Sequence, residues 1–131
     1  MDTAELLDRT RSIALALPDV TERLSHGSPS WFIGPGGGAG PRAASKRLGP
    51  MFASFTDHHH DDDWVGIWAA APAGAQDSLV ERDPDVYFVP DYVGTRGWVG
   101  MRLDATTDWS AVEDLLDDAW NAVSPRARSG P

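Results

Sequence analysis

The stretch WVGMRLDATTDWSAVEDLLDDAWNAV, residues 98–123, decides the fold because it joins a strand pattern to a helix pattern. Apolar side chains occupy every second position from Val99 to Leu103, which is the period of a β-strand. From Asp108, a favoured helix N-cap residue, apolar side chains recur at helical spacing as far as Val123, and acidic side chains fill the opposite side. A strand followed by such a helix predicts that the helix packs on one face of a sheet.

The rest of the chain repeats these two patterns. Asp2 and Glu5 have the spacing of a capping box ahead of an amphipathic run that Pro18 ends, and Asp83-Pro84 ends a second, shorter helix. The expected elements in chain order are a helix over 2–17, an extended run over 30–33, strands over 51–55 and 64–70, a short helix over 75–82, a segment over 86–97 that is extended at first and then looped, a strand over 98–103 and a helix over 108–123.

This order predicts an α+β fold, an antiparallel β-sheet with two long helices, the N-terminal and the C-terminal one, packed on one face. We expect a single domain over 1–125 with a flexible Gly/Pro loop at 34–50 and a frayed tail over 126–131. The Gly/Pro loop lacks the GxxxxGK[ST] spacing of a phosphate-binding loop, so a plain loop is the preferred interpretation.

Composition limits the partners. The 131 residues carry a net charge of −9, and DNA binding depends on Lys and Arg that neutralise phosphates, so the charge disfavours a nucleic acid without excluding a local basic patch. The chain has no cysteine, which removes disulfides and thiol catalysis and suits a reducing cytoplasm. No apolar run approaches the roughly 20 residues of a membrane span, so we expect no membrane partner and a cytoplasmic location.

Tryptophans fall on the strand positions that should point away from the helices. If the apolar positions of 65–69 and 99–103 face the helices, then Trp64, Trp68, Trp98 and Arg102 lie on the other face, over glycines. Such a face could stack a flat ligand or a base, with Arg102 supplying charge. The alternative is that long loops fold over it and make a second small core.

Catalytic patterns are weak. The run His58, His59, His60 followed by three aspartates is a dense set of metal-type ligands, but consecutive strand positions point to opposite faces. A physiological metal, adventitious metal binding and a solvated hairpin tip all remain open for it. The hydroxyls of Ser25 and Ser28 flank His26, but sequence neighbours seldom reach triad geometry. We therefore expect no catalytic residue, no cofactor and no enzyme activity.

Four blocks of the chain together resemble the MmcQ/YjbR family of small bacterial proteins: ALALPDVTERLSHGSPSWFI (14–33), MFASF (51–55), DPDVYFVPDYVGTRGWVGMRLD (83–104) and DWSAVEDLLDDAW (108–120). The resemblance implies a frataxin-like fold, and a DNA-binding role that the family carries through likeness to a double-wing transcription-factor domain. Fold likeness alone does not establish function. The positions that match the family's blocks are His26, Gly27, Pro29, Phe52, Gly97, Trp98 and Arg102. The family places a glycine-lysine pair just before the phenylalanine strand, whereas RLGP separates Lys46 from Met51 here.

Three functions follow as hypotheses. The first is a non-enzymatic binding domain that uses DNA as its partner. The second is a pocket for a small molecule or a peptide between His26 and Trp98. The third is a metal-dependent enzyme through the histidine run at 58–60. The cations available for the first are Arg23, Arg42, Lys46, Arg47, Arg96 and Arg102, and the candidate binding residues overall are His26, Ser28, Lys46, Phe52, Arg96, Trp98 and Arg102.

Overall fold

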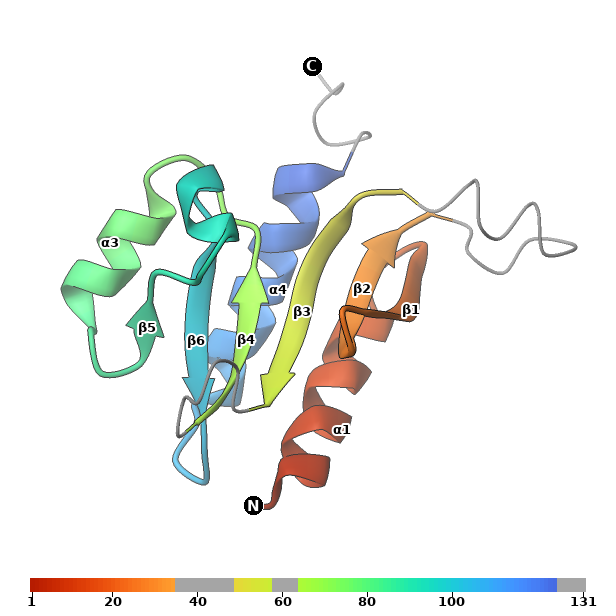
Figure 1. The fold of residues 1–131 in the computed structure, drawn as a ribbon, viewed down its shortest axis with the longest axis horizontal. Helices are drawn as coiled ribbons and strands as arrows, with labels where there is room; N and C mark the ends of the chain where they lie inside the picture. Colours follow the sequence, from red (N-terminus) through yellow and green to blue (C-terminus); the bar gives the residue numbers. More distant parts are fainter. Residues whose placement is uncertain (35–48, 58–63, 125–131) are drawn as a thin grey trace, which may run out of the picture.

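The computed structural model describes residues 1–34, 49–57 and 64–124 (Figure 1). In this part of the chain, six strands form one sheet in the order β1-β2-β3-β4-β6-β5, and each neighbouring pair is antiparallel. The predicted α+β architecture is therefore confirmed. Most of the predicted loop at 34–50, the histidine run at 58–60 and the tail over 126–131 lie outside the described residues.

The elements in chain order are α1 (Thr3–Leu15), β1 (Val20–Ser25), β2 (Ser28–Ile33), β3 (Met51–Asp57), β4 (Val65–Ala69), α3 (Ala75–Arg82), β5 (Tyr87–Phe88), the 3₁₀-helix η2 (Val93–Arg96), β6 (Val99–Leu103) and α4 (Trp109–Val123). Asp2 caps α1 by accepting a hydrogen bond from the Glu5 amide, and Asp108 caps α4 by accepting one from the Ser110 amide. The predicted caps are both present, and the predicted short helix over 75–82 has the observed bounds.

The two long helices lie on the same face of the sheet, behind it in Figure 1. Helix α4 packs on β3 and β4, and α1 packs on β1 and β3 and also against α4. Helix α3 lies at one edge and contacts β5 and β6. The sheet therefore has one face covered by long helices and one face that is not.

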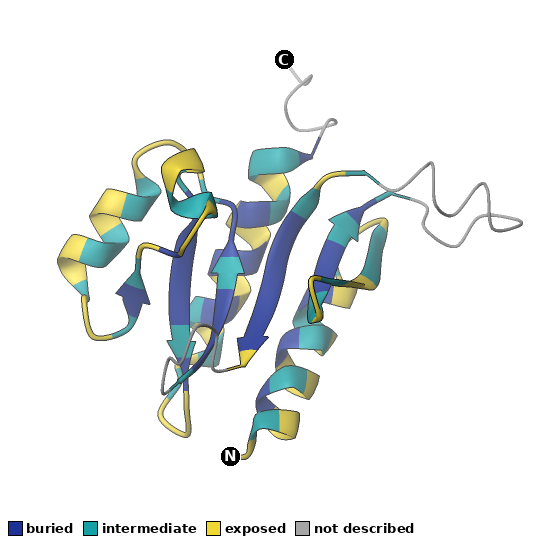
Figure 2. Ribbon diagram, in the orientation of Figure 1, coloured by how far each residue is buried: buried dark blue, intermediate teal, exposed yellow. Residues whose placement is uncertain are grey.

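The main core fills the space between that covered face and the helices. The apolar stripe of α4 contributes Val112, Leu115, Leu116 and Ala119, all of them buried. Strand β3 lies between two other strands and is buried from Phe52 to Thr56, as the dark ribbon in Figure 2 shows. Each fully buried side chain of Leu or Ile size contributes about 1.5–3 kcal/mol through lost apolar surface, so this layer supplies much of the fold's stability.

The sequence interpretation missed strand β1. The segment 18–29 is rich in turn-forming residues, yet Val20–Ser25 pairs along its whole length with β2. A two-residue turn of His26 and Gly27, with φ angles of 52° and 82°, joins the two strands. Two positive φ angles are typical of the type I′ turn that matches the twist of a tight hairpin.

A hydrogen-bonded trio fastens α1 to this hairpin. The Arg11 guanidinium donates two hydrogen bonds to the Glu22 carboxylate, from Nε at 2.8 Å and from its terminal nitrogen at 2.9 Å. The Trp31 indole donates a third to the same carboxylate at 2.9 Å. The bonds from Arg11 are the main cause that lowers the pKa of Glu22, and the Trp31 bond adds to it against the effect of burial. Helix α1 and strands β1 and β2 are thereby joined through one side chain.

We predict that Glu22→Gln lowers the free energy of unfolding by about 1–2 kcal/mol at neutral pH, because charge-assisted hydrogen bonds are lost while the side-chain volume is kept. The pKa of Glu22 is lower in the folded than in the unfolded chain. Its contribution is therefore present above the unfolded value near 4.3 and is lost as pH falls through the folded value. Urea denaturation at pH 7 and near pH 3 measures both effects.

The matched control is Glu113→Gln, which makes the same change at an exposed position of α4. We expect the control to change stability by less than about 0.5 kcal/mol. Equal effects of the two substitutions at pH 7, or an undiminished Glu22→Gln effect at pH 3, would contradict the role given to the trio.

Candidate functional site

The face of the sheet away from α1 and α4, here called the open face, carries a continuous row of cross-strand neighbours. The register pairs Ser30 with Ser54, Ser54 with Trp68, Trp68 with Gly100, and Gly100 with Phe88. The Ser30 and Ser54 hydroxyls are hydrogen-bonded at 3.0 Å. The row thus runs from a polar end on β2 and β3 to an aromatic end on β5.

Arg102 is held within the aromatic end. Its guanidinium lies 4.4 Å from the centre of the Trp64 ring and 5.2 Å from that of Phe88, and the two rings contact each other edge to face at 5.8 Å. It also donates hydrogen bonds to the carbonyls of Pro84 and Asp85, at 3.1 and 2.9 Å. Arg102 therefore stabilises this edge of the sheet, with its donors directed at the protein's own backbone.

Gly100 makes the aromatic end possible. A Cβ atom at this position would come within 2.4 Å of the Phe88 ring, which lies directly over the glycine.

We predict that Gly100→Ala destabilises the fold by about 1–3 kcal/mol, the usual range for an added methyl in a packed site. In the Phe88→Ala background the same substitution should cost little, because the ring that it strikes is gone.

A double-mutant cycle by thermal or urea denaturation tests this coupling. Equal costs of Gly100→Ala with and without the Phe88 ring would contradict the packing described here.

Beyond Trp68 the open face contains a cavity of about 580 Å³. We call it the His26–Trp98 cleft. Its lining has three groups of residues. Four carry hydroxyls on strands β1, β2 and β3: Ser25, Ser28, Ser54 and Thr56. Three are aromatic, Trp68, Tyr92 and Trp98, and the others are His26, Met51 and Val93. Two of the hydroxyls are oriented by the protein, since Ser54 bonds Ser30 and Thr56 donates to the Gly66 carbonyl at 3.2 Å.

Two turns with unusual backbone geometry bound this cleft. His26 has a φ of 52° in the β1–β2 turn. Tyr92 has φ 64° and ψ −57°, and the Val93 amide bonds the Asp91 carbonyl at 2.6 Å, which is the rare γ-turn of positive φ. Within the described ranges, three residues other than glycine have positive φ, and two of them line the cleft. Backbone strain of this kind tends to concentrate at functional sites.

The Tyr92 turn is fixed from behind by α3. The Gln76 side-chain amide donates to the Gly94 carbonyl at 2.8 Å and to the Trp98 carbonyl at 2.6 Å. The Arg96 guanidinium lies 5.4 Å from the centre of the Trp98 ring. These contacts hold η2 over the start of β6, so the wall that carries Tyr92 and Trp98 is braced.

The cleft has little charge. Among the described residues that line it there is no Asp, Glu, Lys or Arg. The lining consists of three aromatic side chains, four Ser and Thr side chains, one imidazole and the apolar side chains of Met51 and Val93. This composition suits an uncharged ligand with a flat ring and a few hydrogen-bonding groups.

The structure brings together some of the residues singled out from the sequence. His26, Ser28 and Trp98 line one cavity, and Arg96 contacts it through the Trp98 ring. Lys46 and His58, His59 and His60 lie outside the described residues.

Two further candidates have structural positions. Arg102 belongs to the aromatic end and is absent from the cleft lining. Phe52 is fully buried, so its ring is not available to a ligand in this structure. The register places Phe52, Ala70 and Trp98 side by side at one end of the open face, where each is at most 3% exposed. A small second core therefore covers that end, whereas Trp68 is only half-buried.

The sequence interpretation missed Ser54, Thr56 and Tyr92 as lining residues. Alternation along β3 placed both hydroxyls on the same side as Trp68, and this signal was present in MFASFT. The local sequence PDYVG does not predict a γ-turn, because tyrosine has no special preference for positive φ.

The described arginines are distributed over five elements of the fold. They are Arg9 and Arg11 on α1, Arg23 on β1, Arg82 on α3, Arg96 on η2 and Arg102 on β6. Arg9 lies over the Trp109 ring at 4.4 Å, and Arg11 is paired with Asp8 and Glu22. Among the residues that the structure describes, no three His, Cys, Asp or Glu side chains are close enough to hold a metal ion.

Catalytic geometry is also missing from the cleft as described. In the residues that the structure covers, no hydrogen bond joins the His26 imidazole to the hydroxyl of Ser25 or Ser28, and an activated serine needs such a bond. Among the described helices, none combines the length and the apolar character that crossing a bilayer requires.

Fold and cleft together define a small α+β domain with helices on one face of its sheet and a cavity on the other. The family model named YjbR matches residues 15–122, and the chain belongs to this family. YjbR is not a known enzyme family. The chain is similar to the crystal structure of Deinococcus radiodurans protein DR2400, described as a DUF419 family-model domain, with a TM-score of 0.69 and 18% identity over 92% of this chain and 79% of that one. At that identity the likeness shows the fold alone. The comparison with curated proteins gives no match.

Proposed function

We propose that this YjbR domain is a non-enzymatic cytoplasmic binding module whose ligand is a small, uncharged molecule with a flat aromatic part, held in the His26–Trp98 cleft. The observation that carries the proposal is the meeting of two positive-φ turns, at His26 and Tyr92, across one cavity. The turns are far apart in the sequence, and each holds a side chain at the cavity in a conformation that costs free energy.

The side chains of the cleft suit this ligand class. Trp68 and Tyr92 contribute aromatic rings to the lining, and Tyr92 is 73% exposed. Ser28 and the oriented hydroxyls of Ser54 and Thr56 supply hydrogen-bonding groups in the same lining. A charged ligand would lose hydration without gaining a partner charge among the described lining residues, so it should bind less well.

The DNA-binding role implied by the family resemblance has less support. Arg11, Arg96 and Arg102 contact other groups of the protein, and the described arginines are scattered over the fold. Duplex affinity depends on several cations that reach phosphates together. DNA binding is therefore the competing outcome of the test below.

The test follows the tryptophan indole N–H signals of ¹⁵N-labelled protein by NMR. Indole and adenine are the neutral flat probes, with benzoate as the charged and cyclohexanol as the non-planar comparison. We expect the flat neutral probes to shift the Trp68 and Trp98 signals in a saturable way and to leave that of Trp31, which is fully buried on the helix side, unchanged.

Tyr92→Ala should weaken binding of the flat probes by about tenfold, because an aromatic contact is worth roughly 0.5–1.5 kcal/mol beyond its area. Leu24→Ala is the matched control, since Leu24 is 74% exposed and does not line the cleft. Equal affinities of the two variants would overturn the proposal. So would duplex DNA binding that falls steeply with salt while no probe moves the cleft signals.

A further inference from the structure

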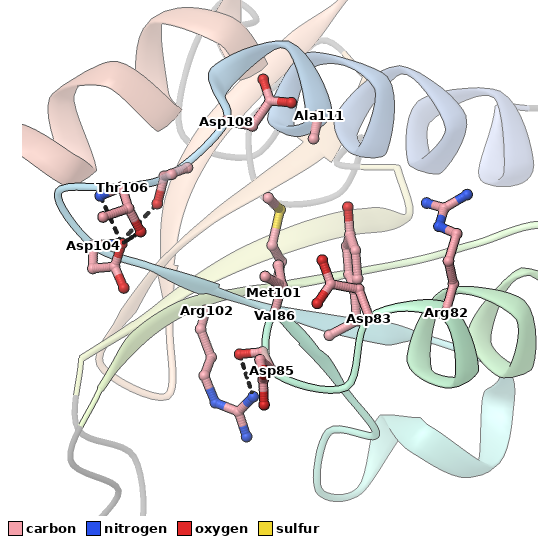
Figure 3. A pocket seen from close by; sticks show the side chains of 12 residues that line it. Arg82, Asp83, Asp85, Val86, Met101, Arg102, Asp104, Thr106, Asp108 and Ala111 are labelled. Atoms are coloured by element: carbon pink, nitrogen blue, oxygen red, sulfur yellow. Dashed lines mark hydrogen bonds between the residues drawn. The ribbon is translucent and has the colours of Figure 1, made fainter.

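A second cavity of about 380 Å³ lies where β5 and β6 meet the beginning of α4 and the end of α3 (Figure 3). It shares no lining residue with the His26–Trp98 cleft. Figure 3 shows Met101 pointing from β6 toward α4, with Asp108 and Ala111 at the start of that helix, and Asp83 near the end of α3. Arg102 is also part of the lining, but its side chain extends to the other side of β6.

The first feature of this cavity is a buried tyrosine whose hydroxyl has no hydrogen-bond partner among the described residues. Tyr87 lines it and is only 7% exposed. Among the described residues, none accepts or donates a hydrogen bond at the Tyr87 hydroxyl. Burial raises the pKa of this phenol, so it is neutral at ordinary pH. Buried polar groups are normally satisfied, and an unsatisfied one calls for an occupant.

An excess of acceptor oxygens is the second feature. Asp104 receives the amide and hydroxyl of Thr106 at 2.8 and 2.6 Å, and Asp108 receives the amide and hydroxyl of Ser110 at 3.0 and 2.7 Å. In each carboxylate one oxygen, Oδ1, accepts both bonds, which leaves Oδ2 able to accept more. The hydroxyl bonds are the main cause that lowers the pKa of both groups, so both are charged at neutral pH.

The cations that line the cavity do not balance these acids. Asp83, Asp85, Asp104 and Asp108 face two arginines in the lining. Arg102 directs its donors to the Pro84 and Asp85 carbonyls, and among the described residues Arg82, the other arginine of the lining, has no hydrogen-bond partner. The cavity therefore offers carboxylate and phenol oxygens to a donor.

We propose that this cavity binds the primary ammonium group of a small alkylamine. An ammonium group has three donors and no acceptor, so it matches a site that presents carboxylate oxygens and a phenol oxygen. Val86, Met101 and Ala111 supply apolar surface for the hydrocarbon part of the ligand. A bare metal ion fits less well, because no three carboxylates or imidazoles of the described residues come close enough to share one.

The test uses the full chain labelled with ¹³C at the ring Cζ of tyrosine. The chain has two tyrosines, so the spectrum contains Tyr87 and Tyr92, and Tyr92 in the other cleft is an internal control. n-Butylammonium is the probe, with n-butanol and butyrate as its uncharged and anionic counterparts. We expect n-butylammonium to shift the Tyr87 signal in a saturable way and to leave that of Tyr92 in place, and we expect no shift with the counterparts.

Two variants separate the contributions. Tyr87→Phe keeps the ring and removes the hydroxyl, and we expect it to weaken n-butylammonium binding by about fivefold, as the loss of one hydrogen bond does. Asp83→Asn should weaken it by a similar factor, whereas Asp118→Asn, the same charge change at an exposed position of α4, should not. Titration calorimetry gives these affinities.

A Tyr87 signal that stays in place on saturation with n-butylammonium would overturn the proposal and would leave water as the occupant. Equal weakening by Asp83→Asn and Asp118→Asn would also overturn it, because binding would then follow the net charge alone. Neither result bears on the His26–Trp98 cleft, whose probes report on tryptophan.

Discussion

The sheet has two faces, and the two long helices cover one of them. This constraint determines where most aromatic side chains of the sheet lie. Apolar side chains at alternate strand positions pack on α1 and α4, so the residues between them must be accommodated on the open face without a helix. Phe88 lies over Gly100 and packs against Trp64, and the Arg102 guanidinium packs on both rings. At the other end of β4, Phe52 and Trp98 are buried beside Ala70.

Between these two covered regions the open face stays hollow. The hollow persists because its two sides are held by backbone geometry rather than by side-chain packing across it. The His26-Gly27 turn fixes one side, and the γ-turn at Tyr92, braced by Gln76, fixes the other. A side chain that could relax into the hollow would fill it, since close packing is the rule in protein interiors. Strained turns that keep a cavity open are a physical reason to assign it a ligand.

Much of the fold could be predicted from the sequence because it depends on periodic patterns. The alternation from Val99 to Leu103 and the stripe of α4 placed the main core correctly, and Asp2 and Asp108 marked the helix starts. Strand β1 was missed because it is an edge strand without a clear apolar alternation. Its polar residue Glu22 makes specific hydrogen bonds with Arg11 and Trp31. The Glu22 contact with Arg11 joins segments that no local pattern connects.

The candidate site was less predictable because it too is formed by segments that no local sequence pattern connects. Alternation placed Trp68 on the open face, and the resemblance pointed to His26 and Trp98. Phe52 lies on the same face by alternation but is buried, because what covers a strand position depends on loops that come later in the chain. Tyr92 and Tyr87 acquire their roles only in three dimensions, one through a turn and one through a cavity at the edge of the sheet.

The central claim is that the open face holds a preformed cleft for a flat neutral ligand. A crystal structure of the protein soaked with indole tests it most directly. The account predicts indole between Trp68 and Tyr92, with His26 and Tyr92 both at positive φ. A Tyr92 residue with an ordinary negative φ, its ring packed on Trp68 and no indole in the space between them, would contradict it.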